Sequence, residues 1–222
     1  MFPLKDTQRS YSRPVVTIAI IAANILIFLF EASLGRYTLN NLIEYYGLVP
    51  DHFQVSRIFT SMFLHGGWMH VLGNMLFLWV FGNNIEDLLG HGKYLLFYLL
   101  CGIVAALGQV VADPHSMVPM VGASGAIAGV MGAYLIKFPR ARIVTLVFVF
   151  VFITTMEIPA PVLLLYWFVI QLFSGIGSIA SHVSAGGTAF FAHIGGFVAG
   201  IVLVKIMGTS DRYNRKRDRY WE

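Results

Sequence analysis

Long apolar stretches constrain this chain more than any other feature. A helix needs about 20 mostly apolar residues to cross a bilayer, and we find six stretches close to that length. They cover residues 14–33, 68–86, 93–111, 122–137, 160–178 and 189–207. Only 12% of the 222 residues are charged, about half the share in a typical soluble domain. We therefore predict an all-α polytopic membrane protein, a bundle of six transmembrane helices.

Two further segments are apolar without clearly spanning. Residues 142–158 are rich in β-branched and aromatic side chains and could form a short span or lie on the outer surface of the bundle; we expect the second. The loop at about 34–67 is also partly apolar, and we expect it to be partly embedded beside the bundle. The six-span domain then covers residues 14–207, between a short N-terminal segment (1–13) and a basic tail (208–222).

Basic residues predict the orientation, because Lys and Arg gather in cytoplasmic loops. With six spans and the N-terminus inside, all but two of the 15 basic residues are cytoplasmic, the exceptions being Arg36 and Arg57. A seventh span would put the basic tail outside. We therefore expect both termini in the cytoplasm, in the plasma membrane of a prokaryote.

The same distribution of charge bears on partners. Basic ends beside apolar spans indicate contact with anionic membrane lipids, and we expect no nucleic acid. Cys101 is the single cysteine and stands in an apolar run, so it has no partner for a disulfide or a metal site. We expect neither a metal nor another cofactor.

Four polar residues stand inside or at the ends of the apolar stretches, where polar groups are costly and often functional. His70 and Asn74 are four residues apart and so share one helix face. Ser124 and His193 each have small residues at three- and four-residue spacing, which let helices approach closely. Taken singly, each is explained as well by helix packing.

The six-span topology brings the four together. The second, fourth and sixth spans then run in the same direction, so all four polar residues lie near the outer ends of their spans. A seventh span at 142–158 would carry His193 to the opposite face from Ser124. Charge and chemistry therefore favour the same topology.

Such a cluster suits nucleophilic catalysis. A serine hydroxyl is a weak nucleophile until a base takes its proton, and His193 could do this for Ser124. The oxyanion formed by attack on a carbonyl needs donors, which His70, Asn74 and the backbone N–H of Ser124 could supply. The outer halves of the spans hold no carboxylate to orient the histidine, and Glu157 is the nearest in sequence. This predicts a Ser–His dyad.

Over residues 10–208 the chain resembles the rhomboid family of intramembrane serine proteases. The motifs that carry the resemblance are Gly122-Ala123-Ser124-Gly125, Ala192-His193 with Gly196 and Gly200, and His65, His70 and Asn74. The resemblance implies Ser124 as nucleophile, His193 as general base and His70 with Asn74 in the oxyanion hole. It implies supporting roles for Gly122, Gly125, His65 and Arg57, and single-span membrane proteins as substrates, cut near the outer membrane boundary.

Two departures from the family pattern concern local packing. Ser56 precedes Arg57 where the family often has Trp, and Ala128 stands where some members have a tyrosine that packs on the histidine. Aromatic residues of the fifth span suggest a lateral gate, although packing or lipid contact explains them equally; they are Tyr166, Trp167, Phe168 and Phe173.

Two other functions stay open. One is a catalytically inactive rhomboid-like protein that binds membrane clients. The other is a small transporter, which predicts polar groups through the whole membrane depth; the gathering of the polar residues at one end disfavours it.

Overall fold

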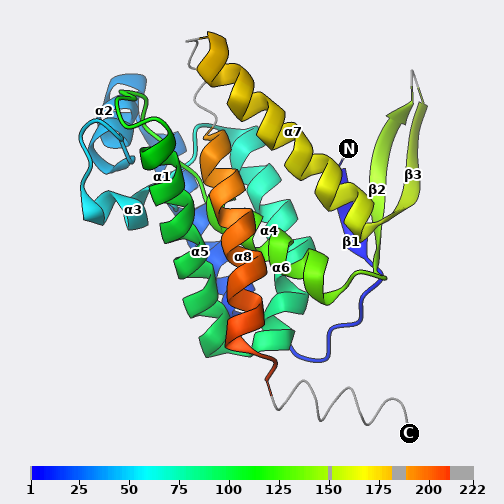
Figure 1. Ribbon diagram of the computed structural model, residues 1–222. Coiled ribbons are helices and arrows are strands. Elements are labelled where there is room, and N and C mark those ends of the chain that lie inside the picture. Colours follow the sequence, from blue (N-terminus) through cyan, green and yellow to red (C-terminus); the bar gives the residue numbers. More distant parts are fainter. Residues whose placement is uncertain (1, 150–151, 182–188, 211–222) are drawn as a thin grey trace, which may run out of the picture.

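Helices make up most of the protein. The computed structural model describes residues 2–149, 152–181 and 189–210 (Figure 1). Its helices are α1 (Val15–Ser33), α2 (Arg36–Tyr46), α3 (Val55–Ser61), α4 (Trp68–Leu89), α5 (His91–Ala112), α6 (Ser124–Lys137), α7 (Ala160–Ser181) and α8 (Phe190–Met207). Its strands are β1 (Phe2–Asp6), β2 (Arg142–Val149) and β3 (Phe152–Pro159).

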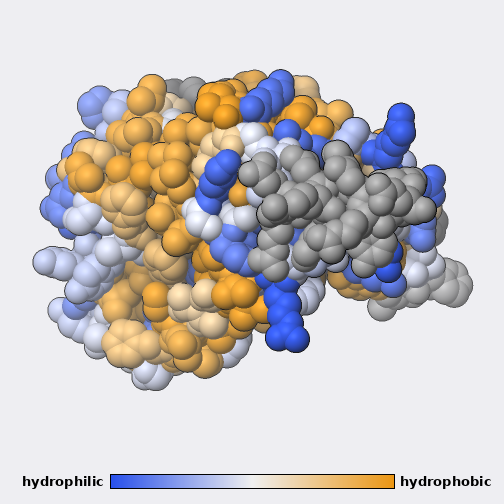
Figure 2. Space-filling model, turned by 90° about the horizontal axis from the view of Figure 1, so that it is seen from below, coloured by the Kyte–Doolittle hydropathy of each residue, from blue (hydrophilic) through white to orange (hydrophobic). Residues whose placement is uncertain are grey.

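A helix stands at each of the six predicted spans. Within the described residues, four are long and apolar enough to cross a membrane, namely α1, α5, α7 over Ala160–Gly177, and α8. Helix α6 has only 14 residues, and α4 carries Glu86 and Asp87 in its last turn. Apolar side chains cover much of the surface in Figure 2, and Leu26, Val111 and Phe173 are 67%, 80% and 70% exposed. Exposed apolar surface of this extent fits contact with lipid, so the chain is an integral membrane protein.

Helix α6 lies at the centre, with every residue from Gly125 to Tyr134 buried. A Cβ atom on Gly196 of α8 would collide with the carbonyl of Gly125, and one on Gly200 with the carbonyl of Gly129. Only glycine lets two helix backbones approach this closely. The contact brings the first turns of α6 and α8 together.

We predicted an all-α protein. The protein is mostly helical, but it also contains a three-stranded sheet. We expected residues 142–158 on the bundle surface. Their described parts, 142–149 and 152–158, are instead the paired strands of a β2–β3 hairpin, and β1 pairs antiparallel with β2. Figure 1 shows this sheet beside the start of α7. Alternate residues of β2, namely Ile143, Thr145 and Val147, are buried. This two-residue period, together with the β-branched composition, favours a half-buried strand over a spanning helix.

The segment before α1 contacts the C-terminal end of α4. Asp87 accepts hydrogen bonds from the backbone N–H of Tyr11 and the hydroxyl of Ser12. Glu86 accepts the backbone N–H groups of Val16 and Thr17, at 2.8 and 2.7 Å. These amides belong to the first turn of α1 and have no acceptor within their own helix. Glu86 therefore caps α1, Asp87 holds the segment before it, and both carboxylates are buried.

The segment at 34–67, which we predicted to be partly embedded, contains α2 and α3. It joins the rest of the protein through an antiparallel bridge between Leu48 and Met120, the latter shortly before α6. The Ser61 carbonyl also accepts the backbone N–H of Gly122 at 2.8 Å. Both contacts hold the turn that leads into Ser124. The basic tail from residue 211 lies outside the described residues.

Candidate active site

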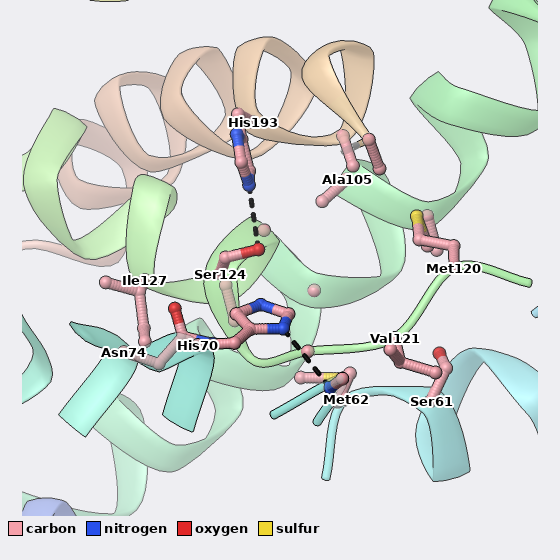
Figure 3. A pocket seen from close by; sticks show the side chains of 18 of the residues that line it. Ser61, Met62, His70, Asn74, Ala105, Met120, Val121, Ser124, Ile127 and His193 are labelled. Atoms are coloured by element: carbon pink, nitrogen blue, oxygen red, sulfur yellow. Dashed lines mark hydrogen bonds between the residues drawn. The ribbon is translucent and has the colours of Figure 1, made fainter. Parts of the chain in front are cut away.

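Ser124 and His193 form a hydrogen-bonded pair (Figure 3). Ser124 is the first residue of α6, and His193 lies in the first turn of α8. The Ser124 Oγ and the His193 Nε2 are 2.7 Å apart. This is the hydrogen-bonding distance that a nucleophile and its general base would need. The close approach of α6 and α8 determines this distance between the two side chains.

His70 and Asn74 face the turn before Ser124. Gly122 has φ +121°, a conformation that favours glycine, and a Cβ there would lie 2.7 Å from His70 Nε2 and 3.4 Å from Asn74 Nδ2. The His70 Nδ1 accepts the backbone N–H of Gly66 at 3.4 Å. In the neutral ring the hydrogen is then on Nε2, which points towards this turn. Two side-chain donors therefore lie beside the serine.

A third donor comes from the backbone. Ser124 opens α6, and the first N–H groups of a helix have no intrahelical acceptor. The helix dipole adds partial positive charge at the same end. An oxyanion formed at Ser124 would therefore meet the His70 ring, the Asn74 amide and the backbone N–H of Ser124.

His65 supports this arrangement from behind. Its Nε2 lies 3.0 Å from the Asn74 amide nitrogen, which can only donate. Its backbone N–H donates to the buried Glu31 carboxylate of α1 at 3.1 Å. His65 therefore fixes the side chain of Asn74, and α1 fixes His65. Arg57 is elsewhere: it lies on α3, with its guanidinium 6.0 Å from the Tyr45 ring centroid.

The pair opens into a pocket of about 590 Å³. The residues that we predicted for the site and that line it are His70, Asn74, Gly122, Ser124, Gly125 and His193. The remaining walls are mostly apolar and include Met62, Met120 and Trp167. None of its lining residues in the described part of the chain is acidic. Glu157, the carboxylate nearest in sequence, pairs with Arg142 across the β2–β3 hairpin at 3.6 Å.

Two residues of α7 that contact His193 were not identified from the sequence as site residues. The Trp167 ring lies 5.5 Å from the His193 ring, centroid to centroid. Trp167 is thus an aromatic residue packed against the His193 ring, and it comes from α7 rather than from position 128 of α6. Gln171, one turn further along α7, has its amide oxygen 2.7 Å from His193 Nδ1. The available signal was a glutamine in an apolar span, four residues after a tryptophan.

Fold and site together define a helical membrane protein with a serine–histidine pair in a pocket between its helices. The rhomboid domain matches residues 52–210, more than half of the chain. The chain belongs to the rhomboid family.

Individual relatives agree with this assignment. The chain is 34% identical over 127 residues to the rhomboid protease GluP of Bacillus subtilis, covering 55% of this chain and 24% of GluP. It is 33% identical over 147 residues to the human mitochondrial presenilin-associated rhomboid-like protein, covering 63% of this chain and 36% of that protein. It is 30% identical over 139 residues to the rhomboid protease GlpG of Salmonella choleraesuis, covering 63% and 49%. Each match spans less than half of the relative's own length.

Proposed function

We propose that the protein is an intramembrane serine endopeptidase that cuts membrane-protein substrates through a Ser124–His193 dyad. The observation that carries the proposal is the 2.7 Å contact between Ser124 Oγ and His193 Nε2. Membership of a family whose relatives are named rhomboid proteases supports it. The donors around the Gly122 turn supply what acyl transfer needs next to such a pair.

The reaction follows from this geometry. His193 Nε2 takes the Ser124 proton as Oγ attacks the carbonyl carbon of the scissile peptide bond. The carbonyl oxygen becomes an oxyanion between His70, Asn74 and the backbone N–H of Ser124. His193 then gives the proton to the leaving amine, and the C–N bond breaks to leave an acyl-enzyme. Water, deprotonated by His193, hydrolyses the ester and restores the serine.

We further propose six membrane spans with both termini in the cytoplasm. Besides the four helices that qualify by length and composition, this assigns α4 and the short α6 as spans. The distribution of basic residues supports it, because only Arg36 and Arg57 then lie outside. The prokaryotic plasma membrane stays a prediction, since the relatives include Bacillus and mitochondrial proteins.

The substrates that we propose are single-span membrane proteins, reaching the site from the lipid. A pocket with mostly apolar walls beside the Ser124–His193 pair suits a mainly apolar segment with one exposed peptide bond. Tyr166 and Phe173 of α7 are 54% and 70% exposed, as expected of a helix that faces lipid. Their part in a lateral gate remains a proposal.

The test uses purified protein in lipid nanodiscs, a fluorophosphonate probe and a single-span reporter. We expect the wild type to label at Ser124 and to cut the reporter. Ser124→Ala should do neither, and His193→Ala should lose on the order of 10³-fold or more of both rates, because the two residues act as a unit. Ser33→Ala, at an exposed serine of α1, is the matched control and should behave like the wild type.

Two outcomes would count against the proposal. Undiminished cleavage by Ser124→Ala would refute the assignment of Ser124 as the nucleophile. A wild type that binds the reporter but neither labels nor cuts would indicate the inactive binding protein.

A further inference from the structure

Gln171 is the third member of a hydrogen-bonded chain that begins at Ser124. Its Oε1 lies 2.7 Å from Nδ1 of His193, and the Nε2 of the same ring lies 2.7 Å from Ser124 Oγ. The two ring nitrogens are therefore both engaged. Gln171 comes from α7, whereas Ser124 and His193 come from α6 and α8, so the chain links three helices.

Only one form of the neutral ring suits this chain. An amide oxygen accepts hydrogen bonds and cannot donate, so His193 Nδ1 must carry the ring hydrogen. Its Nε2 is then the acceptor, which is the state in which it can take the proton of Ser124. The opposite tautomer would place a hydrogen between Nε2 and Oγ and would leave Nδ1 without a donor for Gln171. It could not act as a base towards the serine.

Gln171, rather than a carboxylate, contacts Nδ1 of His193. Proteases with a serine–histidine–carboxylate triad use the carboxylate to select this tautomer, but no acidic residue lines the pocket within the described residues. Trp167, four residues earlier on the same face of α7, packs against the His193 ring. Gln109 of α5 acts on the backbone instead, since its side-chain oxygen accepts the N–H of Ala192 at 3.4 Å. One glutamine therefore contacts the start of α8, and the other contacts the ring.

We propose that Gln171 is the positioning residue of the catalytic pair, its amide oxygen accepting the Nδ1 hydrogen of His193 and so holding Nε2 ready as the base. The inference rests on the Ser124–His193 dyad proposed above. Gln171 exchanges no proton in the reaction. When His193 becomes an imidazolium, the amide dipole continues to accept from Nδ1 and stabilises the charge. A neutral acceptor does this without placing a second ionised group in the bundle.

The experiment compares Gln171→Met, Gln171→Glu and the control Gln109→Met, each in nanodiscs. Methionine keeps the length of the side chain but has no strong acceptor. Glutamate keeps the acceptor and adds charge. One readout is the pH profile of kcat/KM for the reporter, with kcat and KM measured separately. The other is ¹⁵N NMR of labelled histidine, with the His193 signals identified by their loss in His193→Ala.

We expect wild-type His193 to be the Nδ1–H tautomer. Gln171→Met should lower kcat by roughly 10- to 100-fold, within the range for aligned acid–base groups, with little change in KM. The NMR spectrum of Gln171→Met should also show both neutral tautomers of His193. Gln171→Glu should keep the Nδ1–H tautomer and move the acid limb of the profile to higher pH, because a nearby negative charge favours the imidazolium. Gln109→Met should change neither the tautomer nor that limb.

Wild-type His193 with its hydrogen on Nε2, or Gln171→Met with unaltered kcat and tautomer, would overturn the role of Gln171. If Gln171→Met fails to fold, the tautomer of wild-type His193 and the pH profile of Gln171→Glu still test the positioning role of Gln171. A wild type that never labels with fluorophosphonate would refute the dyad instead, which separates the two failures.

Discussion

At the scale of single residues, the contacts of Asn74 suit the oxyanion role proposed for it. Its amide nitrogen donates to His65 Nε2 at 3.0 Å, and the same nitrogen faces the turn at Gly122. An amide nitrogen has two hydrogens, so one can stay with His65 while the other meets an oxyanion. The donor therefore needs no rearrangement during the reaction, which is what makes such groups effective.

We predict that Asn74→Ala lowers kcat by roughly 10²-fold, the usual scale for one lost oxyanion donor, with a smaller effect on KM. Steady-state cleavage of the reporter measures both constants. Asn41→Ala, at an exposed asparagine of α2, is the control and should match the wild type. If Asn74→Ala loses stability in proportion to activity, Asn74 is a packing residue.

At the scale of elements, the contact between α6 and α8 determines the distance between the two reacting groups. Gly200 lies two helical turns after His193, and a Cβ there would overlap the backbone of Gly129. Backbone cannot move aside as a flexible side chain can. The two helices would have to separate, and Ser124 and His193 would separate with them.

We therefore predict that Gly200→Ala destabilises the protein by about 1–3 kcal/mol, as overpacking usually does. It should also slow fluorophosphonate labelling of Ser124. The midpoint of thermal unfolding and the labelling rate measure the two effects. The matched control is Gly92→Ala, because the space around Gly92 in α5 is open. Wild-type labelling by a folded Gly200→Ala protein would contradict this account of the helix contact.

Strand β1 carries a carboxylate, Asp6, whose ionisation affects the stability of the fold. Asp6 accepts hydrogen bonds from Asn84 Nδ2 at 2.6 Å and from the Tyr134 hydroxyl. Burial nevertheless raises the pKa of Asp6 to about 6, compared with about 3.9 in an unfolded chain. The folded state therefore binds more protons between these two values. The stability contributed by protonating Asp6 is fully present below pH 3.9 or so and is lost as pH rises through about 6.

We expect the wild type to lose stability relative to Asp6→Asn as the pH rises from 4 to 7. The asparagine keeps an acceptor for Asn84 and Tyr134 but never ionises. Thermal unfolding of both proteins across this range isolates Asp6, because the other titrating groups are common to the two. A constant difference between their unfolding midpoints would show that Asp6 ionises freely when the strand is docked.

At the scale of the whole molecule, α4 and α8 run in the same direction, from the upper to the lower end in Figure 1. Their first turns carry His70 and His193. The site therefore lies at one end of the bundle, while Asp87 and the segment before α1 lie at the other. In the six-span topology proposed above, this end of the bundle is the outer one.

This predicts that a reporter fused after Glu222 is active only if it functions in the cytoplasm. A tag inserted after His115, which is exposed between α5 and α6, should be accessible only from outside. Accessibility in intact cells measures both positions. Placing the two on the same side would refute the six-span topology.

Much of this architecture could be predicted from the sequence. The positions of the helices at the six apolar stretches follow from hydropathy, because a bilayer requires about 20 consecutive apolar residues with internally satisfied backbone. Within the described residues, four of these helices are long and apolar enough to span, whereas α6 has only 14 residues. The gathering of His70, Asn74, Ser124 and His193 at one end follows from their places in those stretches. The first inference depends on the order of residues along single elements, and the second also on the alternating direction of successive spans.

Tertiary structure alone decided the rest. Which face of α7 meets α8 depends on helix rotation and packing, so the contacts of Trp167 and Gln171 with His193 could not be read from spacing. Residues 142–158 were apolar enough for several structures, and strand β1, from the far end of the chain, helped to select the sheet. Glu157 pairs with Arg142 only because that hairpin aligns them. Contacts between distant segments form where surfaces fit in space, and no local pattern encodes that fit.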